Sequence, residues 1–309
     1  MPCPGGPIRG MAPAGTAGGG EMDRPLDGRV ALVTGATNGI GRVTAREFAR
    51  MGARTLIVAR DPGKGEAVAR EIRDATGAPA EVLVADLSSR DQVRRLAGAV
   101  RDRAGQLDLL VNNAGAIFAE RRLSADGVEM TLALNHLAYF HLTLELLPLL
   151  RQAPEARVVN VSSMAHERAS MDFEDLQGER RYGMWKAYGQ SKLANVLFTR
   201  ELARRLSATR ITANALHPGA VASGFGRDHP GFFGRLVAIG APFLASPEKG
   251  ARTTLHVATA PALRGVTGKY FSSCREKAPS RAAVDGDTAL RLWQISEAMT
   301  QPTTRLPAP

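Results

Sequence analysis

A tyrosine and a lysine four residues apart, Tyr188 and Lys192, are the residues of this chain best suited to proton chemistry. Residues with this spacing share one face of a helix, so the lysine ammonium can lie near the tyrosine phenol. A phenol with a pKa of about 10 is a poor base at neutral pH, but a nearby cation lowers that pKa. The pair therefore suits proton exchange with a substrate oxygen, although Tyr-x-x-x-Lys also occurs by chance in many helices.

Two further polar residues could take part in the same chemistry. Ser163 follows an apolar run that predicts a strand over Arg157–Val161, and its hydroxyl could hydrogen-bond a substrate oxygen. Asn135 interrupts an apolar helical stretch, where a buried amide must find partners or destabilise the packing. Asn135 is thus either a satisfied core residue or a residue that holds a water in an active site.

A glycine-rich segment over 35–41 lies between an apolar run and a helical pattern. Gly35 allows a sharp turn, Gly39 removes a side chain where a pyrophosphate must approach, and Gly41 lets helix and strand pack closely. Free N–H groups at the start of the helix would then face an anion. The spacing is Gly-x-x-x-Gly-x-Gly rather than Gly-x-Gly-x-x-Gly, so this segment alone does not distinguish a nucleotide cradle from a tight loop.

From Asp27 onward, short apolar runs alternate with helical patterns. The predicted strands are Val30–Thr34, Thr55–Ala59, Glu81–Ala85, Leu107–Val111, Arg157–Val161 and Ile211–Leu216. The predicted helices are Arg42–Met51, Gly63–Ala75, Ser89–Ala104, Ser124–Leu150, Lys186–Leu206, Pro247–Ala258 and Thr288–Met299. Nearly continuous apolar strands indicate a parallel sheet buried on both faces, and repeated βα units predict an α/β, doubly wound sheet in a single domain.

Open α/β sheets bind ligands at the carboxyl ends of their strands. Arg60 follows the second predicted strand, where an acidic residue would bind a ribose 2′-hydroxyl; a guanidinium there favours a 2′-phosphate, unless it only caps a helix with Asp61. Asp86 and Leu87 follow the third strand, and the carboxylate could accept from an adenine amino group. Small polar residues, Asn112–Gly115, follow the fourth, where backbone must lie against a cofactor.

These motifs, in this order, resemble the short-chain dehydrogenase/reductase family, over about Asp27 to Met299. The motifs are Thr34-Gly-x-x-x-Gly-Ile-Gly41, Asn112-Asn-Ala-Gly115, Asn135, Ser163, Tyr188-x-x-x-Lys192 and Pro218-Gly219. Four further segments resemble the retinol dehydrogenase and WW-domain oxidoreductase branch: the insert His166–Trp185, Ser191-Lys-Leu-Ala-Asn195, His217-Pro-Gly219 and Gly268-Lys-Tyr-Phe271. The gap between Ser163 and Tyr188 is longer than the dozen or so residues usual in the family.

The resemblance implies a Rossmann fold, a nicotinamide cofactor, a homo-oligomer and a catalytic tetrad of Asn135, Ser163, Tyr188 and Lys192. The residues expected to bind the cofactor are Gly35, Thr37, Asn38, Gly39, Ile40, Gly41, Arg60, Asp86, Leu87, Asn113, Ala114, Gly115, Tyr188, Lys192, Pro218, Gly219 and Val221. The charge at Arg60 predicts NADP(H) in preference to NAD(H). The expected function is hydride transfer between the nicotinamide and a carbonyl or alcohol; the alternative is a dinucleotide-binding sensor or scaffold without turnover.

The substrate is expected to contact two segments, Met164–Trp185 and Ala222–Ser246. The second is rich in apolar residues: Phe225, Phe232, Phe233, Leu236, Val237, Ile239 and Phe243. It predicts an apolar lid over a lipophilic retinoid-, steroid- or aldehyde-like substrate, although packing on the core or a dimer contact would explain the same composition.

Composition argues against several other classes of protein. The net charge is +10, but the excess is arginine scattered along helices, and aromatic residues make up only 5%, so nucleic-acid binding is not expected. No apolar run reaches the roughly 20 residues of a membrane span, and no segment has the apolar core of a secretory signal. Histidines show no metal-ligand spacing, so no metal is proposed. We expect a cytoplasmic protein with a disordered extension over 1–26, one domain over 27–300 and a tail over 301–309.

Overall fold

The structure is a computed structural model that describes residues 24–219 and 245–307 of the 309-residue chain. A central sheet runs through this part of the chain in the order β3-β2-β1-β4-β5-β6-β7-β8. The strands are β1 Val30–Thr34, β2 Arg54–Ala59, β3 Ala80–Val84, β4 Leu109–Asn112, β5 Ala156–Val161, β6 Ile211–His217, β7 Tyr270–Ser272 and β8 Arg275–Glu276. All neighbours pair in parallel except β7 and β8.

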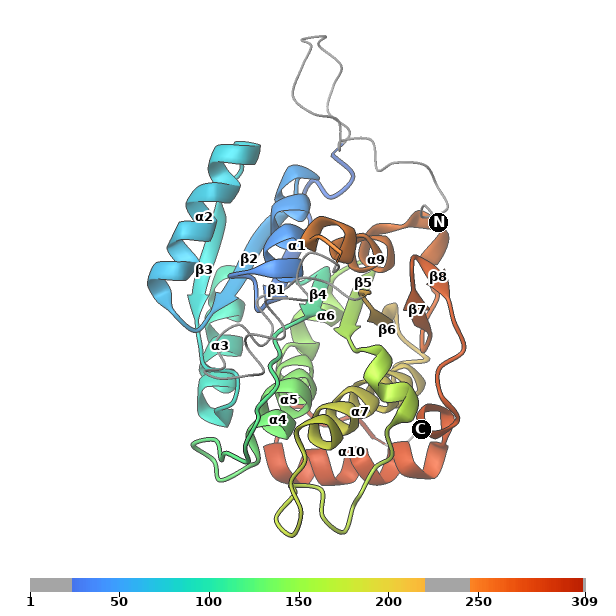
Figure 1. The fold of residues 1–309 in the computed structure, drawn as a ribbon. Helices are drawn as coiled ribbons and strands as arrows, with labels where there is room; N and C mark the ends of the chain where they lie inside the picture. Colours follow the sequence, from blue (N-terminus) through green and yellow to red (C-terminus); the bar gives the residue numbers. More distant parts are fainter. Residues whose placement is uncertain (1–23, 220–244, 308–309) are drawn as a thin grey trace.

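Helices cover both faces of the sheet (Figure 1). They are α1 Gly39–Arg50, α2 Pro62–Thr76, α3 Arg90–Arg103, α4 Met130–Leu132, α5 Ala138–Glu145, α6 Leu147–Gln152, α7 Met184–Arg205, α9 Pro247–Thr259 and α10 Gly286–Thr300. One core cluster joins the sheet to α1, α2 and α9, and a second joins it to α3, α5, α7 and α10. In β1, Leu32 belongs to one cluster and Val33 to the other, because successive strand residues face opposite sides. The predicted Rossmann-type doubly wound sheet is confirmed.

The order of the strands places the site. The chain leaves β1 toward β2 and β3 on one side and then returns to form β4 on the other side of β1. This reversal is the topological switch point, where the loops after β1 and β4 separate and leave room for a ligand. The glycine-rich segment follows β1 and Asn112 ends β4, so both predicted cofactor segments lie at this point.

The predicted helix over 124–150 is wrong in its start and in its continuity. Helical structure begins at Met130, after Glu129 caps it by accepting from the N–H groups of Thr131 and Leu132, both at 2.8 Å. A π-helical turn, Ala133–Leu137, then interrupts the α-helical hydrogen bonding before α5. Apolar periodicity does not reveal a glutamate cap or a π-turn, and so the sequence predicted one long helix. The short strands β7 and β8 were also not identified as strands.

The carboxyl-terminal helix is part of the core. Trp293 of α10 packs edge-on to Phe140 of α5 at 4.8 Å between ring centroids, and it contacts Phe198 of α7 at 6.0 Å. The Arg205 guanidinium lies 4.2 Å from the Trp293 ring centroid, which adds a cation–π contact. The chain continues past α10 along the same side, where Leu306 is buried.

The two tryptophans of the chain offer a matched test of this packing. Trp293 is 2% exposed and Trp185 is 61% exposed. Trp293→Ala should lower the free energy of unfolding by about 3–5 kcal/mol, because it removes a buried aromatic side chain and leaves a cavity. Trp185→Ala should change it by less than about 0.5 kcal/mol. Urea denaturation of both variants measures the difference; equal effects would show that α10 is not docked as described.

Candidate active site

The glycine-rich turn between β1 and α1 packs directly against the loop after β4. Gly35 and Gly39 have positive φ angles of 63° and 51°, a region that glycine adopts without strain. A Cβ atom on Gly35 would lie 2.7 Å from the Ala114 Cα atom, and one on Gly41 would lie 2.5 Å from the Asn113 amide nitrogen. The backbone here has no room for side chains at these positions.

Hydrogen bonds hold the two loops together. The Thr34 hydroxyl accepts from the backbone N–H groups of Asn113 at 2.9 Å and Ala114 at 3.0 Å. In return, the Asn113 amide donates to the carbonyl oxygens of Thr34 at 3.0 Å and Gly35 at 3.1 Å. Asn113 was predicted to contact the cofactor; its side chain instead braces the glycine turn, so any direct contact falls to its backbone.

The start of α1 suits an anion. The helix begins at Gly39, Asn38 makes no side-chain capping bond, and no acidic residue lies in the first turn. The first N–H groups of a helix have no partners within the helix, and the helix dipole makes this end positive. The turn thus fits the pyrophosphate of a dinucleotide, with Thr37 and Asn38 beside it on the partly open surface.

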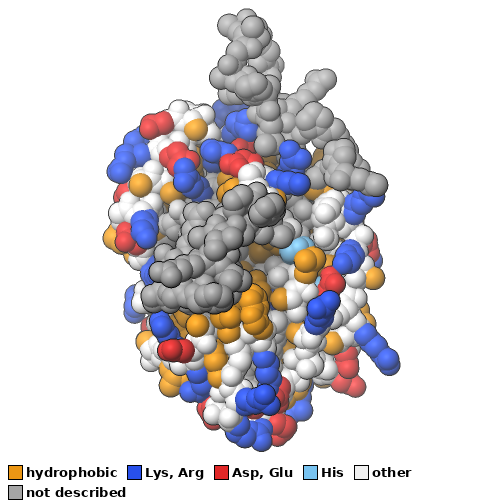
Figure 2. Space-filling model, in the orientation of Figure 1, with side chains coloured by type: hydrophobic (Ala, Val, Ile, Leu, Met, Phe, Trp, Pro, Cys, Tyr) orange, Lys and Arg blue, Asp and Glu red, His pale blue; other side chains and the backbone are white. Residues whose placement is uncertain are grey.

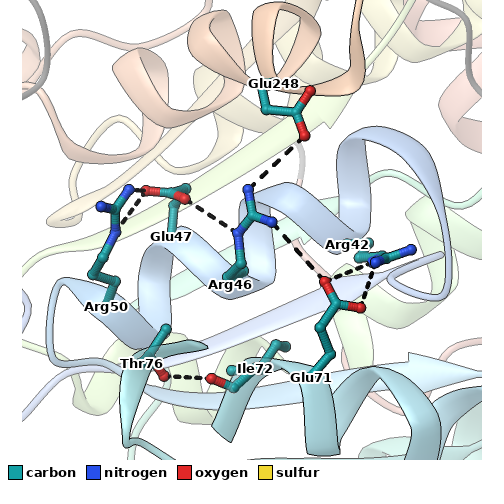
Figure 3. Close-up of polar contacts among 8 residues, drawn as sticks. All are labelled: Arg42, Arg46, Glu47, Arg50, Glu71, Ile72, Thr76 and Glu248. Atoms are coloured by element: carbon teal, nitrogen blue, oxygen red, sulfur yellow. Dashed lines mark hydrogen bonds and ion pairs between the residues drawn. The ribbon is translucent and has the colours of Figure 1, made fainter. Parts of the chain in front are cut away.

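Arg60 is exposed at the end of β2. The adjacent Asp61 caps α2 without it, accepting from the Lys64 N–H at 2.9 Å, and Arg60 forms no hydrogen bond or ion pair with any residue in the described ranges. Arg42 differs, because it is paired with Glu71 of α2 at 2.5 Å (Figure 3). Within the described ranges, Arg60 therefore keeps its donors available to a phosphate at this edge.

The loop after β3 places an acid at the expected position. Asp86 is half-buried, and its Oδ1 atom accepts from the Ser88 backbone at 2.9 Å and from the Ser88 hydroxyl at 2.7 Å. Leu87 is buried beside it. One carboxylate oxygen thus fixes the loop and the other is left to accept from a ligand amino group.

Asn135 lies in the π-turn, where its side chain is fully used by the protein. Its Oδ1 atom accepts from the Ala116 N–H at 2.8 Å, and its amide donates to the Ala116 carbonyl at 2.9 Å and the Ser191 hydroxyl at 3.1 Å. The side chain of Asn135 is therefore a core amide whose hydrogen bonds are satisfied by the protein. A π-turn inside a helix is frequently found at functional sites.

Ser163, Tyr188 and Lys192 meet at the carboxyl end of β5. The Lys192 ammonium donates to the Val161 carbonyl at 3.1 Å and lies 5.7 Å from the centre of the Tyr188 ring. The Tyr188 side chain is hydrogen-bonded to Ser163, and Lys192 is 3% exposed. A Cβ atom on Gly115 would lie 3.5 Å from the Lys192 nitrogen, so the loop after β4 adjoins the same point.

Burial controls the ionisation of this pair. Loss of water raises the pKa of Tyr188 to about 12, against a smaller lowering by its hydrogen bond to Ser163. Burial also lowers the pKa of Lys192 to about 7. The sequence predicts that the lysine charge lowers the tyrosine pKa, and the direction found here is the opposite. Desolvation of the phenol dominates.

Some site residues escaped prediction, and some predictions lie outside the described residues. Ser191 and Asn195 both form hydrogen bonds with Asn135. They lie three and seven residues after Tyr188, and this helical spacing could have placed them on the same face of the helix as the tyrosine. Pro218 and Gly219 end the described segment after β6, with a φ of 92° at Gly219. Val221, and the apolar segment predicted as a lid except for its last two residues, lie outside the described ranges.

Comparison with known proteins agrees with this geometry. A family model described as short chain dehydrogenase matches residues 29–230. Retinol dehydrogenase 12 of Bos taurus is 46% identical over 277 residues, which cover 89% of this chain and 87% of that protein. Retinol dehydrogenase 13 of Homo sapiens is 39% identical and covers 91% of this chain and 87% of its own length. The chain therefore belongs to the short-chain dehydrogenase/reductase family and is an oxidoreductase.

Solved structures show the same fold. An uncharacterized protein from Mycobacterium Paratuberculosis has a TM-score of 0.73 and 38% identity, covering 91% of this chain and 96% of that one. The RhlG/NADP active-site complex of Pseudomonas aeruginosa has a TM-score of 0.64 and 29% identity, covering 87% and 99%. Within the described ranges no three histidine, cysteine or acidic residues are placed to hold a metal, and no helix there has the length and apolarity to cross a membrane.

Gly41 provides a test of the cradle, with Gly98 as a matched control. A Cβ on Gly41 meets the Asn113 amide at 2.5 Å, whereas one on Gly98 of α3 meets only the end of Arg101, at 3.8 Å. Gly41→Ala should weaken dinucleotide binding and folding by about 1–3 kcal/mol, because backbone must move. Gly98→Ala should leave binding unchanged and stabilise the helix by about 0.5–1 kcal/mol. Calorimetric titration with NADPH and thermal denaturation measure both; unweakened binding in Gly41→Ala would refute the cradle.

Proposed function

We propose that this protein transfers hydride between NADP(H) and a lipophilic aldehyde, ketone or alcohol. The observation that carries the proposal is the meeting of Ser163, Tyr188 and Lys192 at the end of β5, beside the glycine turn. When bound, the nicotinamide supplies or accepts the hydride. The residues of the chain would orient the substrate oxygen and move its proton.

Each residue of the tetrad has a role that its contacts support. Tyr188 would exchange a proton with the substrate oxygen, and Ser163, already bonded to Tyr188, would orient that oxygen. Lys192 would hold the nicotinamide ribose and, when charged, favour the phenolate. Because the Asn135 side chain is occupied by Ala116 and Ser191, a water in the proton path would bind its backbone carbonyl, which has two lone pairs.

Two exposed apolar side chains next to the tetrad support a lipophilic substrate. Met164, directly after Ser163, is 52% exposed, and Trp185 is 61% exposed with its ring edge-on to Tyr188 at 6.4 Å. Figure 2 shows hydrophobic side chains gathered near the centre of this view of the molecule. The names of the retinol dehydrogenases, which are this similar over most of the chain, agree with a retinoid-like substrate.

The preference for NADP(H) rests on Arg60, whose guanidinium has no partner in the described part of the chain and lies at the end of β2, where a 2′-phosphate would be recognised. The RhlG complex contains NADP, which supports the same choice. The cytoplasmic location and the homo-oligomer stay predictions.

Tyr188→Phe removes the hydroxyl and keeps the ring. We expect substrate-dependent NADPH oxidation to fall at least about 100-fold, with NADPH affinity within a factor of about three. Tyr270→Phe is the matched control, since that buried hydroxyl lies on β7, outside the tetrad and outside both segments expected to contact the substrate, and it should retain turnover. A panel of retinoid, steroid and small polar carbonyls should be used for both variants. Turnover that survives in Tyr188→Phe would refute the proton role, and binding without turnover in the unmodified protein would favour a sensor.

Arg60→Asp tests the cofactor preference. Loss of a charge-assisted bond to the 2′-phosphate should weaken NADPH binding by about 10–100-fold, while NADH binding should be unchanged or improved. Arg70→Ala, at an exposed arginine of α2, controls for net charge and should change neither affinity. Parallel titrations of NADPH and NADH measure the ratio. An unchanged ratio in Arg60→Asp would contradict the assignment of Arg60.

A further inference from the structure

Asn195 is a fully buried amide on α7, three residues after Lys192. Its Nδ2 atom donates to the Asn135 carbonyl at 2.9 Å and reaches the Val161 carbonyl at 3.4 Å. A buried amide without partners is strongly unfavourable, so a site that keeps one usually needs its geometry. The two carbonyls are the ones that flank the candidate proton path.

The first carbonyl belongs to the π-turn. The Ala138 N–H donates to Ala133, five residues earlier, instead of to the residue four earlier. This extra residue displaces backbone groups from the normal helical ladder, so a carbonyl in the turn can face α7. The Asn195 side-chain amide donates a hydrogen bond to the Asn135 backbone carbonyl. It thereby fixes the direction of the carbonyl on which a proton-path water would bind.

The second carbonyl also binds the lysine. Val161 ends β5, and its oxygen accepts from the Lys192 ammonium at 3.1 Å and lies 3.4 Å from the Asn195 amide nitrogen. Ser162 and Ser163 follow this residue directly. The Asn195 side chain on α7 therefore contacts both the carbonyl that binds the Lys192 ammonium and the carbonyl of the π-turn.

The backbone at Asn195 and the π-turn that it contacts are each held by a neighbouring element. The Thr199 hydroxyl donates to the Asn195 backbone carbonyl at 2.6 Å and accepts from the Asn160 side-chain amide of β5 at 2.9 Å. In the π-turn, the His136 ring bonds the Ser296 hydroxyl of α10 at 2.8 Å. The backbone at Asn195 is thus tied through Thr199 to β5, and the π-turn is tied through His136 to the carboxyl-terminal helix.

We propose that Asn195 is a positioning residue for hydride and proton transfer: by bonding the Asn135 and Val161 carbonyls it sets the distance between the proton-path carbonyl and the Lys192 ammonium. The proposal rests on the reductase function proposed above. It predicts that losing the amide reduces the chemical step and leaves the binding surfaces intact, because Asn195 is buried beneath the site.

Asn195→Leu keeps the approximate shape and removes the donor. The matched control is Asn214→Leu, at a buried asparagine of β6 whose amide donates to the Val266 carbonyl at 2.7 Å. Asn195→Leu should lower kcat about 100-fold, as expected for small misplacements of reacting groups, with KM for substrate and Kd for NADPH within about threefold. Asn214→Leu should destabilise the fold and leave kcat within about threefold.

Amide hydrogen exchange of residues 133–140 gives a readout that does not need turnover. Exchange there should accelerate at least about tenfold more in Asn195→Leu than in Asn214→Leu, each relative to the unmodified protein. If Asn195→Leu does not fold, Asn195→Ser, whose hydroxyl is too short to reach both carbonyls, serves for both measurements.

The outcomes separate the two proposals. An unmodified protein that turns over NADPH, with unchanged kcat and exchange in the Asn195 variants, overturns the positioning role alone. An unmodified protein without turnover overturns the reductase function, and unchanged exchange would then overturn the positioning role as well. A fall in kcat that Asn214→Leu reproduces, or a rise in KM in place of the fall in kcat, also contradicts positioning.

Discussion

A lysine side chain removed from water is the constraint on which this site depends. Lys192 is 3% exposed and its ammonium donates to one carbonyl, that of Val161. Burial lowers its pKa to about 7, below that of a lysine in the unfolded chain. Protonation of Lys192 therefore lowers the free energy of unfolding, and the loss is largest at low pH. That cost grows as pH falls from about 10 to about 7 and is constant below, at about 1.4 kcal/mol for each pKa unit. A fold retains such a group only where the rest of the core supports it, and perturbed ionisation of this kind is typical of functional sites.

The support comes from backbone carbonyls that the topology brings to one edge. Parallel strands put the ends of β1, β4 and β5 side by side. Thr34 and Asn113 join the loops after β1 and β4, and the Asn135 amide joins the loop after β4 to the π-turn. The glycine turn can then lie against the loop after β4, whose Gly115 adjoins the lysine. The glycine turn and the tetrad therefore both adjoin the loop after β4.

The sequence predicted features that depend on residue spacing and missed features that depend on local hydrogen bonding or on the desolvation of a buried group. Apolar runs and glycines predicted the doubly wound parallel sheet and the glycine-rich turn. The i, i+4 spacing placed Tyr188 and Lys192 on one helix face, which agrees with the distance of 5.7 Å between the Tyr188 ring centre and the Lys192 ammonium. The sequence could not reveal that Glu129 would cap a helix, or that the helix would contain a π-turn at Asn135, because neither alters the apolar periodicity. It also gave the wrong sign for the shift of the Tyr188 pKa, because the number of waters lost by a phenol is a property of the packed structure.

That sign bears on the direction of the reaction. If Tyr188 exchanges the proton, reduction of a carbonyl requires it to start protonated, and a pKa of about 12 keeps it so at neutral pH. Oxidation of an alcohol requires the phenolate, which a neutral lysine does little to stabilise. Because the pKa of Lys192 is about 7, any bound anion that raises it would increase the lysine charge and lower the barrier to phenolate formation. The two directions thus depend unequally on the charge of the same ammonium.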